Sequence, residues 1–229
     1  MIDKRVADLA AAVAGIEDGA TVLVGGFGDA GVPNDLVQAL VEQGAKELTL
    51  VGNGAISEVV GHGRLIAEGR VRKFIASFPK GRGSKLFEPG DASESVELEI
   101  VPQGTLAERI RAAGAGIPGF YTATAFGTPL AEGKQTMEFD GNQFVLERAI
   151  QADVALIKAK TADRWGNLAY TGTARNFNPI MAMAAKRTIA QVSEIIDPDP
   201  LDPEYIVTPG IFVERVVAVA DDLREEGRQ

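Results

Sequence analysis

Cysteine is absent from this chain of 229 residues, and histidine occurs once. Without cysteine the chain has no disulfides, no thiolate nucleophile and no sulfur ligands for a metal. A transition-metal site would have to rely on carboxylates, and a Ser-His-Asp triad would have to use His62. That residue stands in GHG (61–63), away from any serine–acid arrangement. We therefore expect neither a metal site nor a triad.

Long apolar runs and an excess of positive charge are also missing. No run of about 18 apolar residues occurs, so the sequence predicts no membrane-spanning helix. Residues 1–19 lack the uninterrupted apolar core of a signal peptide. A net charge of −9 argues against nucleic-acid binding, because a duplex binder needs a basic face to displace counterions. These absences predict a cytoplasmic protein without nucleic-acid or membrane partners.

Strand-like and helix-like segments alternate in the first half of the chain. Apolar residues at helical spacing predict an amphipathic helix over residues 1–16. Such alternation is typical of a mainly parallel sheet with helices on its faces. The further strands are expected at 20–26, 46–53, 71–78 and 96–104, and the further helices at 34–44, 57–69 and 105–116.

The second half is less regular. A loop is expected at 119–134, followed by a hairpin over 134–150 whose turn is Asp140-Gly141. The segment 221–229 is charged and is expected to fray. Strands are expected at 152–160, 187–196 and 210–220, with a short helix at 181–187. The sequence thus predicts one α/β domain over residues 1–229: a mainly parallel sheet flanked by helices, with a β-hairpin elaboration.

The glycine-rich segment GGFGDAG (25–31) contains a formal match to the GxGxxG dinucleotide fingerprint. A nicotinamide site also needs an acidic residue at the end of the second strand. That strand ends in Asn53, and Glu47 stands at its start instead. No GK[ST] follows the glycines, which excludes a Walker loop. Two interpretations of the glycine segment remain. In one, its backbone amides, together with the start of a helix near Pro33, are arranged to bind a phosphate or carboxylate; in the other, the segment is a tight, closely packed turn.

Three polar strand ends are predicted to meet at one edge of the sheet. The first strand ends at the glycine segment, the second at Asn53 and the fourth at Gln103. Ligands of open parallel sheets gather outside the carboxyl ends of the strands. Asparagine and glutamine offer N–H donors that suit a carboxylate and do not titrate. Capping of strand ends is the structural alternative for both side chains.

Several blocks of this sequence resemble the A subunits of family I 3-oxoacid CoA-transferases. The resemblance runs from about residue 3 to about residue 220. It rests on the segment 18–33, on VPQGTLAERIR (101–111) and GAGIP (114–118), and on DRWGNL (163–168), ARNF (174–177) and TPGIFV (208–213). It implies a subunit that helps to move CoA from succinyl-CoA to a 3-oxo acid. SFP (77–79) and PIMAMAAK (179–186) favour 3-oxoadipate as that acid, with acetoacetate as the alternative.

The same resemblance implies that the nucleophile lies in another chain. In this family a glutamate of the B subunit, within a Ser-Glu-Asn-Gly motif, attacks the thioester, and this chain has no such motif. The implied assembly is an A2B2 heterotetramer without a cofactor, in which CoA thioester is a substrate. The resemblance assigns substrate binding to Asn53 and Gln103, and CoA binding, or lining of the acyl pocket, to Gly25, Gly26, Phe27, Gly28, Asp29, Ala30 and Gly31.

Two segments depart from that family pattern. Related enzymes have two asparagines followed by Ala-Gly where this chain has Asn53-Gly54-Ala55-Ile56, so one side-chain amide is lost. The segment 80–85 (KGRGSK) carries three positive charges, and it is either a solvated loop or a segment that attracts CoA phosphates or a dicarboxylate. A phosphosugar isomerase or sensor of similar fold would need Asp, Glu or His at the strand ends. A non-catalytic binding module is the third class.

Overall fold

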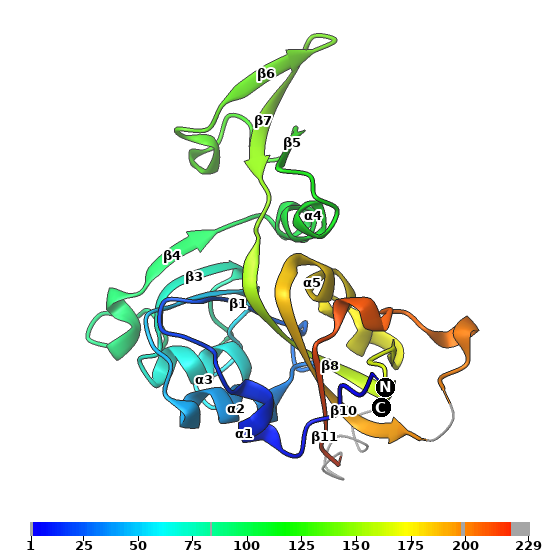
Figure 1. Cartoon of the computed structure of the whole chain (residues 1–229). Coiled ribbons are helices and arrows are strands. Elements are labelled where there is room, and N and C mark those ends of the chain that lie inside the picture. Colours follow the sequence, from blue (N-terminus) through cyan, green and yellow to red (C-terminus); the bar gives the residue numbers. More distant parts are fainter. Residues whose placement is uncertain (1, 83, 198–199, 221–229) are drawn as a thin grey trace.

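The computed structural model describes residues 2–82, 84–197 and 200–220. Within them the main sheet has eight strands in the order β11-β10-β8-β1-β2-β3-β4, and β9 pairs with β8 (Figure 1). Every pair along that order is parallel, and only β9 is antiparallel. The strands are β1 (Thr21–Val24), β2 (Leu48–Gly54), β3 (Val71–Phe78), β4 (Glu97–Ile100), β8 (Ala152–Asp163), β9 (Leu168–Ala169), β10 (Ala185–Ile196) and β11 (Arg215–Ala218).

Helices cover both faces of this sheet (Figure 1). One face carries α1 (Leu9–Val13), α2 (Asn34–Gln43) and α3 (Gly61–Ala67), and the other carries α4 (Gln103–Gly114) and α5 (Asn178–Ala184). Val22 packs into the first core and Leu23 into the second, so consecutive residues of β1 serve opposite faces. Burial on both faces explains why the strands read as continuous apolar runs. The sequence-based prediction of a mainly parallel sheet flanked by helices is confirmed.

A second, antiparallel sheet projects from the body next to α4 (Figure 1). Its order is β5-β7-β6, formed by β5 (Gly119–Thr122), β6 (Thr136–Phe139) and β7 (Asn142–Arg148). Asp140 and Gly141 both have positive φ, as a two-residue hairpin turn requires. The predicted hairpin is confirmed. The predicted loop at 119–134 is wrong at its start, because residues 119–122 pair with β7.

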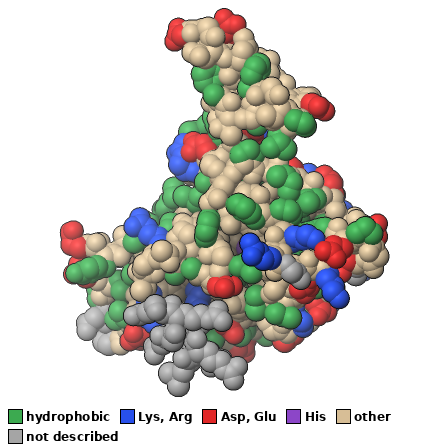
Figure 2. Space-filling model, turned by 180° about the vertical axis from the view of Figure 1, so that it is seen from behind, with side chains coloured by type: hydrophobic (Ala, Val, Ile, Leu, Met, Phe, Trp, Pro, Cys, Tyr) green, Lys and Arg blue, Asp and Glu red, His purple; other side chains and the backbone are tan. Residues whose placement is uncertain are grey.

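This projecting sheet, with the loop between β5 and β6, forms an arm that exposes apolar side chains. Figure 2 shows hydrophobic side chains on its surface, seen from behind. The exposed ones are Phe126, Leu130, Met137 and Phe139. Short 3₁₀ helices complete the described chain: η1 (Ala92–Ser95), η2 (Pro129–Ala131), η3 (Gly172–Arg175), η4 (Pro203–Tyr205) and η5 (Gly210–Phe212).

Several predicted boundaries of helices and strands are wrong. Pairing with a distant strand explains the error in the first predicted helix. The helix expected over residues 1–16 is limited to α1, because the chain before it lies alongside β11. The Val6 amide donates to the Val216 carbonyl (3.0 Å), and Asp8 caps α1 by accepting from the Ala11 amide (2.7 Å). The expected strand at 210–220 opens with η5, and the expected helix at 181–187 begins earlier and ends at Ala184. The segment 221–229 lies outside the described residues.

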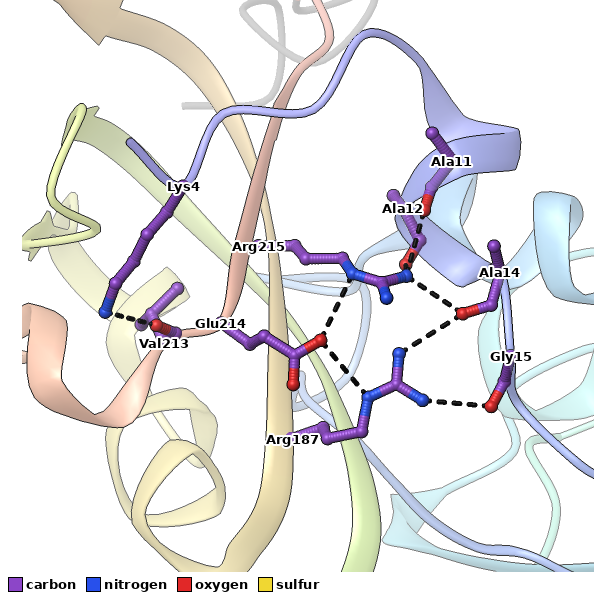
Figure 3. A network of polar contacts seen from close by, with 9 residues as sticks. All are labelled: Lys4, Ala11, Ala12, Ala14, Gly15, Arg187, Val213, Glu214 and Arg215. Carbon is purple, nitrogen blue, oxygen red and sulfur yellow. Dashed lines mark hydrogen bonds and ion pairs between the residues drawn. The ribbon is translucent and has the colours of Figure 1, made fainter. Parts of the chain in front are cut away.

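An arginine pair ties α1 to the strands β10 and β11 (Figure 3). Arg215 donates to the carbonyl oxygens of Ala11, Ala12 and Ala14 at 2.9–3.0 Å. Arg187 donates to the carbonyls of residues 14 and 15, and Glu214 accepts from both guanidinium groups. These cations satisfy carbonyls that the end of a short helix leaves without partners.

We expect Arg215→Ala to lower the free energy of unfolding by about 1–3 kcal/mol, because it removes charge-assisted hydrogen bonds to three carbonyls. Chemical denaturation of the purified chain measures this change. Arg111→Ala is the matched control, since Arg111 forms only an exposed pair with Glu108. It should change stability by less than about 1 kcal/mol. Equal effects of the two substitutions would contradict the structural role of Arg215.

Candidate active-site half

The glycine segment forms a tight turn after β1. The Gly25 amide donates to the Leu156 carbonyl (2.9 Å), and Phe27 and Ala30 exchange backbone hydrogen bonds of 3.0 and 3.1 Å. Gly26 and Gly28 have φ values of 115° and 63°, a region that favours glycine. The turn thus places Gly28 and Asp29 at its tip, with Phe27 and Ala30 paired on either side of them.

Asn178 at the start of α5 fixes this turn from behind. Its side chain is fully buried; Oδ1 accepts from the Lys158 amide (3.1 Å), and Nδ2 donates to the Gly31 and Ala174 carbonyls (3.1 and 2.9 Å). A Cβ at Gly25 would overlap Asn178 Oδ1, so close packing explains that glycine.

The amides near the turn are largely used within the protein. Those of Gly25, Phe27 and Ala30 donate to backbone carbonyls, and the Leu36 amide in the first turn of α2 donates to Gln191 Oε1 (3.3 Å). The turn therefore does not present an uninterrupted row of amides to an anion. Close packing explains Gly25, Gly26 and Gly31, because a Cβ at each would overlap neighbouring atoms. A Cβ at Gly28 would meet nothing within 4 Å, so ligand contact is left to the tip of the turn.

Two cavities open at the carboxyl edge of the sheet, and both reach this tip. The first, called here the amide cavity, has a volume of about 340 Å³, and Asn53 lies in its wall. The second has a volume of about 500 Å³ and contains His62. Gly28, Gly54 and Ile56 line both. The amide cavity is lined by Phe27, Gly28, Asn53, Gly54, Ala55, Ile56, Phe78, Lys80, Gly81 and Arg82. The structure thus brings Asn53 and the glycine turn together.

Gln103 shares the sheet edge but not these cavities. It is the first residue of α4, shortly after the end of β4. Ala76 of β3 pairs with Gly52 on one side and Ile100 on the other, so β4 lies two strands from β2, or about 10 Å away. Gln103 is not among the lining residues of either cavity. The predicted convergence holds for Asn53 and the turn only.

Two residues that are neighbours in register at the ends of β2 and β3 each have a buried side-chain oxygen without a hydrogen-bond partner among the described residues. Asn53 is 7% exposed, and its Oδ1 has no hydrogen-bond partner among the described residues. Ser77 is its neighbour in register, between the pairs Gly52–Ala76 and Gly54–Phe78, and its Oγ is also buried and unpaired. Such groups are rare and each costs about 1–3 kcal/mol. They indicate a site that a group from outside this chain completes.

The rest of the amide cavity combines apolar walls with two cations. Phe27 and Phe78 are 46% and 59% exposed. The segment after β3 crosses closely over the end of β2, because the Gly81 amide donates to the Ala55 carbonyl (2.8 Å) and a Cβ at Gly81 would overlap the Ile56 carbonyl. This crossing brings Lys80 and Arg82 to the cavity. The charges of this segment were identified from the sequence, where SFP (77–79) is only a mark of resemblance and assigns Ser77 and Phe78 no place in the site.

His62 is a buried structural residue. Its Nε2 donates to the Val24 carbonyl (2.9 Å), and its ring lies 5.9 Å from that of Phe74. Burial lowers its pKa to about 4, although the hydrogen bond to Val24 opposes the shift. The imidazole is therefore neutral at pH 7 and is already committed to a backbone carbonyl. The sequence-based rejection of a triad at His62 agrees with this environment.

His62 makes stability depend on pH. Because its pKa is about 4 in the folded chain and 6.5 ordinarily, the unfolded state takes up a proton first as pH falls. The free energy of unfolding of the wild type should therefore fall between pH 6.5 and 4, by about 2–3 kcal/mol more than that of His62→Gln. Denaturant titrations over this range measure the difference. Parallel curves for the two proteins would contradict the assigned environment.

Across the described ranges, no group of three or more His, Asp or Glu side chains is arranged to hold a metal ion. Among the described residues there is also no helix with the length and apolarity needed to cross a membrane.

Comparison with known proteins identifies the class. The coenzyme A transferase family model matches residues 6–219. The chain is 53% identical to the A subunit of the 3-oxoadipate CoA-transferase of Pseudomonas putida, covering 96% of this chain and 95% of that one. It is 52% identical to the A subunit of a "probable succinyl-CoA:3-ketoacid coenzyme A transferase" of Bacillus subtilis (strain 168), covering 88% and 84%.

A solved structure supports the same fold. Glutaconate coenzyme A-transferase from Acidaminococcus fermentans superposes with a TM-score of 0.83 at 24% identity, covering 95% of this chain and 76% of that one. The family match over residues 6–219 and the identity to these relatives show that the chain belongs to the coenzyme A transferase family.

Proposed function

We propose that this chain is the A subunit of a heteromeric CoA-transferase that moves CoA from succinyl-CoA to a 3-oxo acid, with 3-oxoadipate as the favoured acceptor. A B subunit supplies the nucleophilic glutamate in an A2B2 assembly. Family membership and the names of the two relatives, both of which are A subunits, support this. The exposed apolar side chains of the arm are a feature of chains that work in assemblies.

One observation carries the proposal: the amide cavity contains polar and cationic groups but no nucleophile. Its described lining has the side-chain amide of Asn53, whose oxygen is unpaired, and two cations, and no carboxylate, hydroxyl or imidazole. Asn53 lies at the sheet edge where ligands of parallel sheets bind. Such a site binds a carboxylate or thioester well but cannot attack one. A phosphosugar isomerase would need an acid or base here, and the nearby His62 is bound to Val24.

The chemistry is the one that the family resemblance implies. The partner's carboxylate attacks the thioester carbonyl carbon, the C–S bond breaks, and a mixed anhydride and CoA thiolate form. The thiolate then attacks the anhydride at the glutamyl carbon, which leaves an enzyme–CoA thioester and releases succinate. The 3-oxo acid reverses these steps. The amide N–H of Asn53 donates to the oxygen on which negative charge develops, and because it does not titrate it does so at any working pH.

The first test is reconstitution. The purified chain alone should show no CoA transfer, because its cavity lacks a nucleophile. Addition of a B-type subunit with Ser-Glu-Asn-Gly should give transfer from succinyl-CoA, measured by formation of the 3-oxoacyl-CoA. Turnover by the chain alone would refute the proposal. Comparing kcat/KM for 3-oxoadipate and acetoacetate in the same pair decides between the two acceptors.

The second test removes the amide. In the reconstituted pair, Asn53→Ala should lower kcat by about 10²-fold, the loss typical of one donor to a developing oxyanion. Its thermal stability should stay within a few degrees, because Oδ1 has no partner to lose. Asn142→Ala is the matched control, since Asn142 is the exposed first residue of β7 and its side chain donates, among the described residues, to the Asp140 carbonyl alone. Full activity of Asn53→Ala would remove Asn53 from the site.

A further inference from the structure

The three cations of the segment 80–85 have different surroundings. Lys80 Nζ forms an ion pair with Glu88 (2.9 Å), which neutralises its charge. Glu58 accepts from the Lys85 amide and the Ser84 hydroxyl, so it holds the backbone at this end of the segment. Arg82 is exposed and has no hydrogen bond or ion pair within the part of the chain that the structure describes. It is therefore the uncompensated cation on the wall of the amide cavity.

The amide cavity is polar at Asn53, cationic at Arg82 and mostly apolar elsewhere, and the charge of Lys80 in its wall is paired with Glu88. The buried side-chain amide of Asn53 belongs to the end of β2, whereas Arg82 belongs to the segment that crosses over it. Side chains of Phe27, Ile56 and Phe78 form the rest of the wall. A volume of about 340 Å³ is within the range of sites for small molecules. Such a lining matches an acyl chain that has a polar group at each end.

The two polar groups differ in a way that fits the proposed reaction. The reacting carboxyl of an acyl substrate becomes a neutral thioester or anhydride, so a neutral amide suits it in every state. A second carboxylate at the far end stays ionised throughout, and a permanently charged guanidinium is the matching donor. Succinate and 3-oxoadipate both carry such a second carboxylate, and acetoacetate does not.

We infer that Arg82 binds the distal carboxylate of the acyl substrate, so that the amide cavity selects dicarboxylic over monocarboxylic acids. This inference rests on the proposed function and adds the residue that sets the substrate class. Arg82 acts as a specificity-determining residue, because it contacts the end of the substrate that does not react.

The test uses two acceptors of equal length in the reconstituted pair: 3-oxoadipate, and 3-oxohexanoate, which has a methyl group in place of the distal carboxylate. Arg82→Ala should lower kcat/KM for 3-oxoadipate about 10- to 100-fold, mainly through KM, and leave that for 3-oxohexanoate within about twofold. Arg82→Lys should retain part of the preference. The ratio of the two kcat/KM values is the readout, because loss of folded enzyme lowers both equally.

Arg72→Ala is the matched control. Arg72 is an exposed arginine on β3 that bonds to Thr49 Oγ1 (3.3 Å), and it does not line the amide cavity. Arg72→Ala changes the net charge by the same amount as Arg82→Ala, and it should leave the ratio of the two kcat/KM values unchanged. An unchanged ratio in Arg82→Ala would overturn the inference. Normal activity with both acceptors would indicate that Arg82 lies in a solvated loop. An equal loss of activity with both acceptors would indicate that Arg82 contacts the phosphates of CoA.

Failure of the proposed function would look different. If the wild-type pair transferred CoA to neither acid, the function would be refuted, and Arg82 would be tested separately by calorimetry. Adipate should then bind the wild-type chain more tightly than hexanoate, and Arg82→Ala should remove that difference. Equal binding of the two acids by the wild type would overturn the inference.

Discussion

The parallel pairing of β2 with β3 is the constraint on which the candidate site depends. Its register sets Asn53 beside Ser77 and aligns the ends of both strands at one edge. The segments that leave these ends must then cross, and they come close enough that a side chain at Gly81 would overlap the backbone at Ile56. A slip of one residue would turn Asn53 to the opposite face. Sheet register therefore determines that Asn53 lines the amide cavity.

The unpaired oxygens at this edge reflect a conflict between stability and function. Other buried polar side chains are paired: Asn178 bonds to three backbone groups, and Asp163 accepts from the amides of Trp165 and Asn167. The remaining unpaired buried atoms of the described side chains are the Nε atoms of Arg64, Arg70 and Arg164. The oxygens of Asn53 and Ser77 are left without partners in the same fold. Unsatisfied polar groups persist where a ligand or another chain supplies the missing partner. In the proposed assembly the partner chain has that role for the Asn53 oxygen, which needs a donor that an ionised acyl substrate does not offer.

Much of the fold follows from local patterns. The sheet and its flanking helices could be predicted from the apolar runs of the buried strands and from the alternation of strands and helices. The hairpin could be predicted from the Asp140-Gly141 turn. The errors arise where pairing across the chain overrides local preference. Residues 4–6 have a helical pattern but lie along β11, and residues 119–122 look like a loop but form β5. Long-range hydrogen bonds leave no short-range signal in the sequence.

The sequence by itself determined which side chains stand at the strand ends: a glycine turn follows the first strand, and Asn53 lies at the end of the second. The order of residues in the chain fixes these side chains, whatever the arrangement of the strands. It also excluded a nucleophile of the Ser-Glu-Asn-Gly type and any thiol. Only the tertiary structure decided which of these groups share a space. It joined Asn53 to the glycine turn and Arg82, left Gln103 two strands away, and bound His62 to a backbone carbonyl. The physical reason is that strand order and the crossing of loops set distances between residues that are remote in sequence.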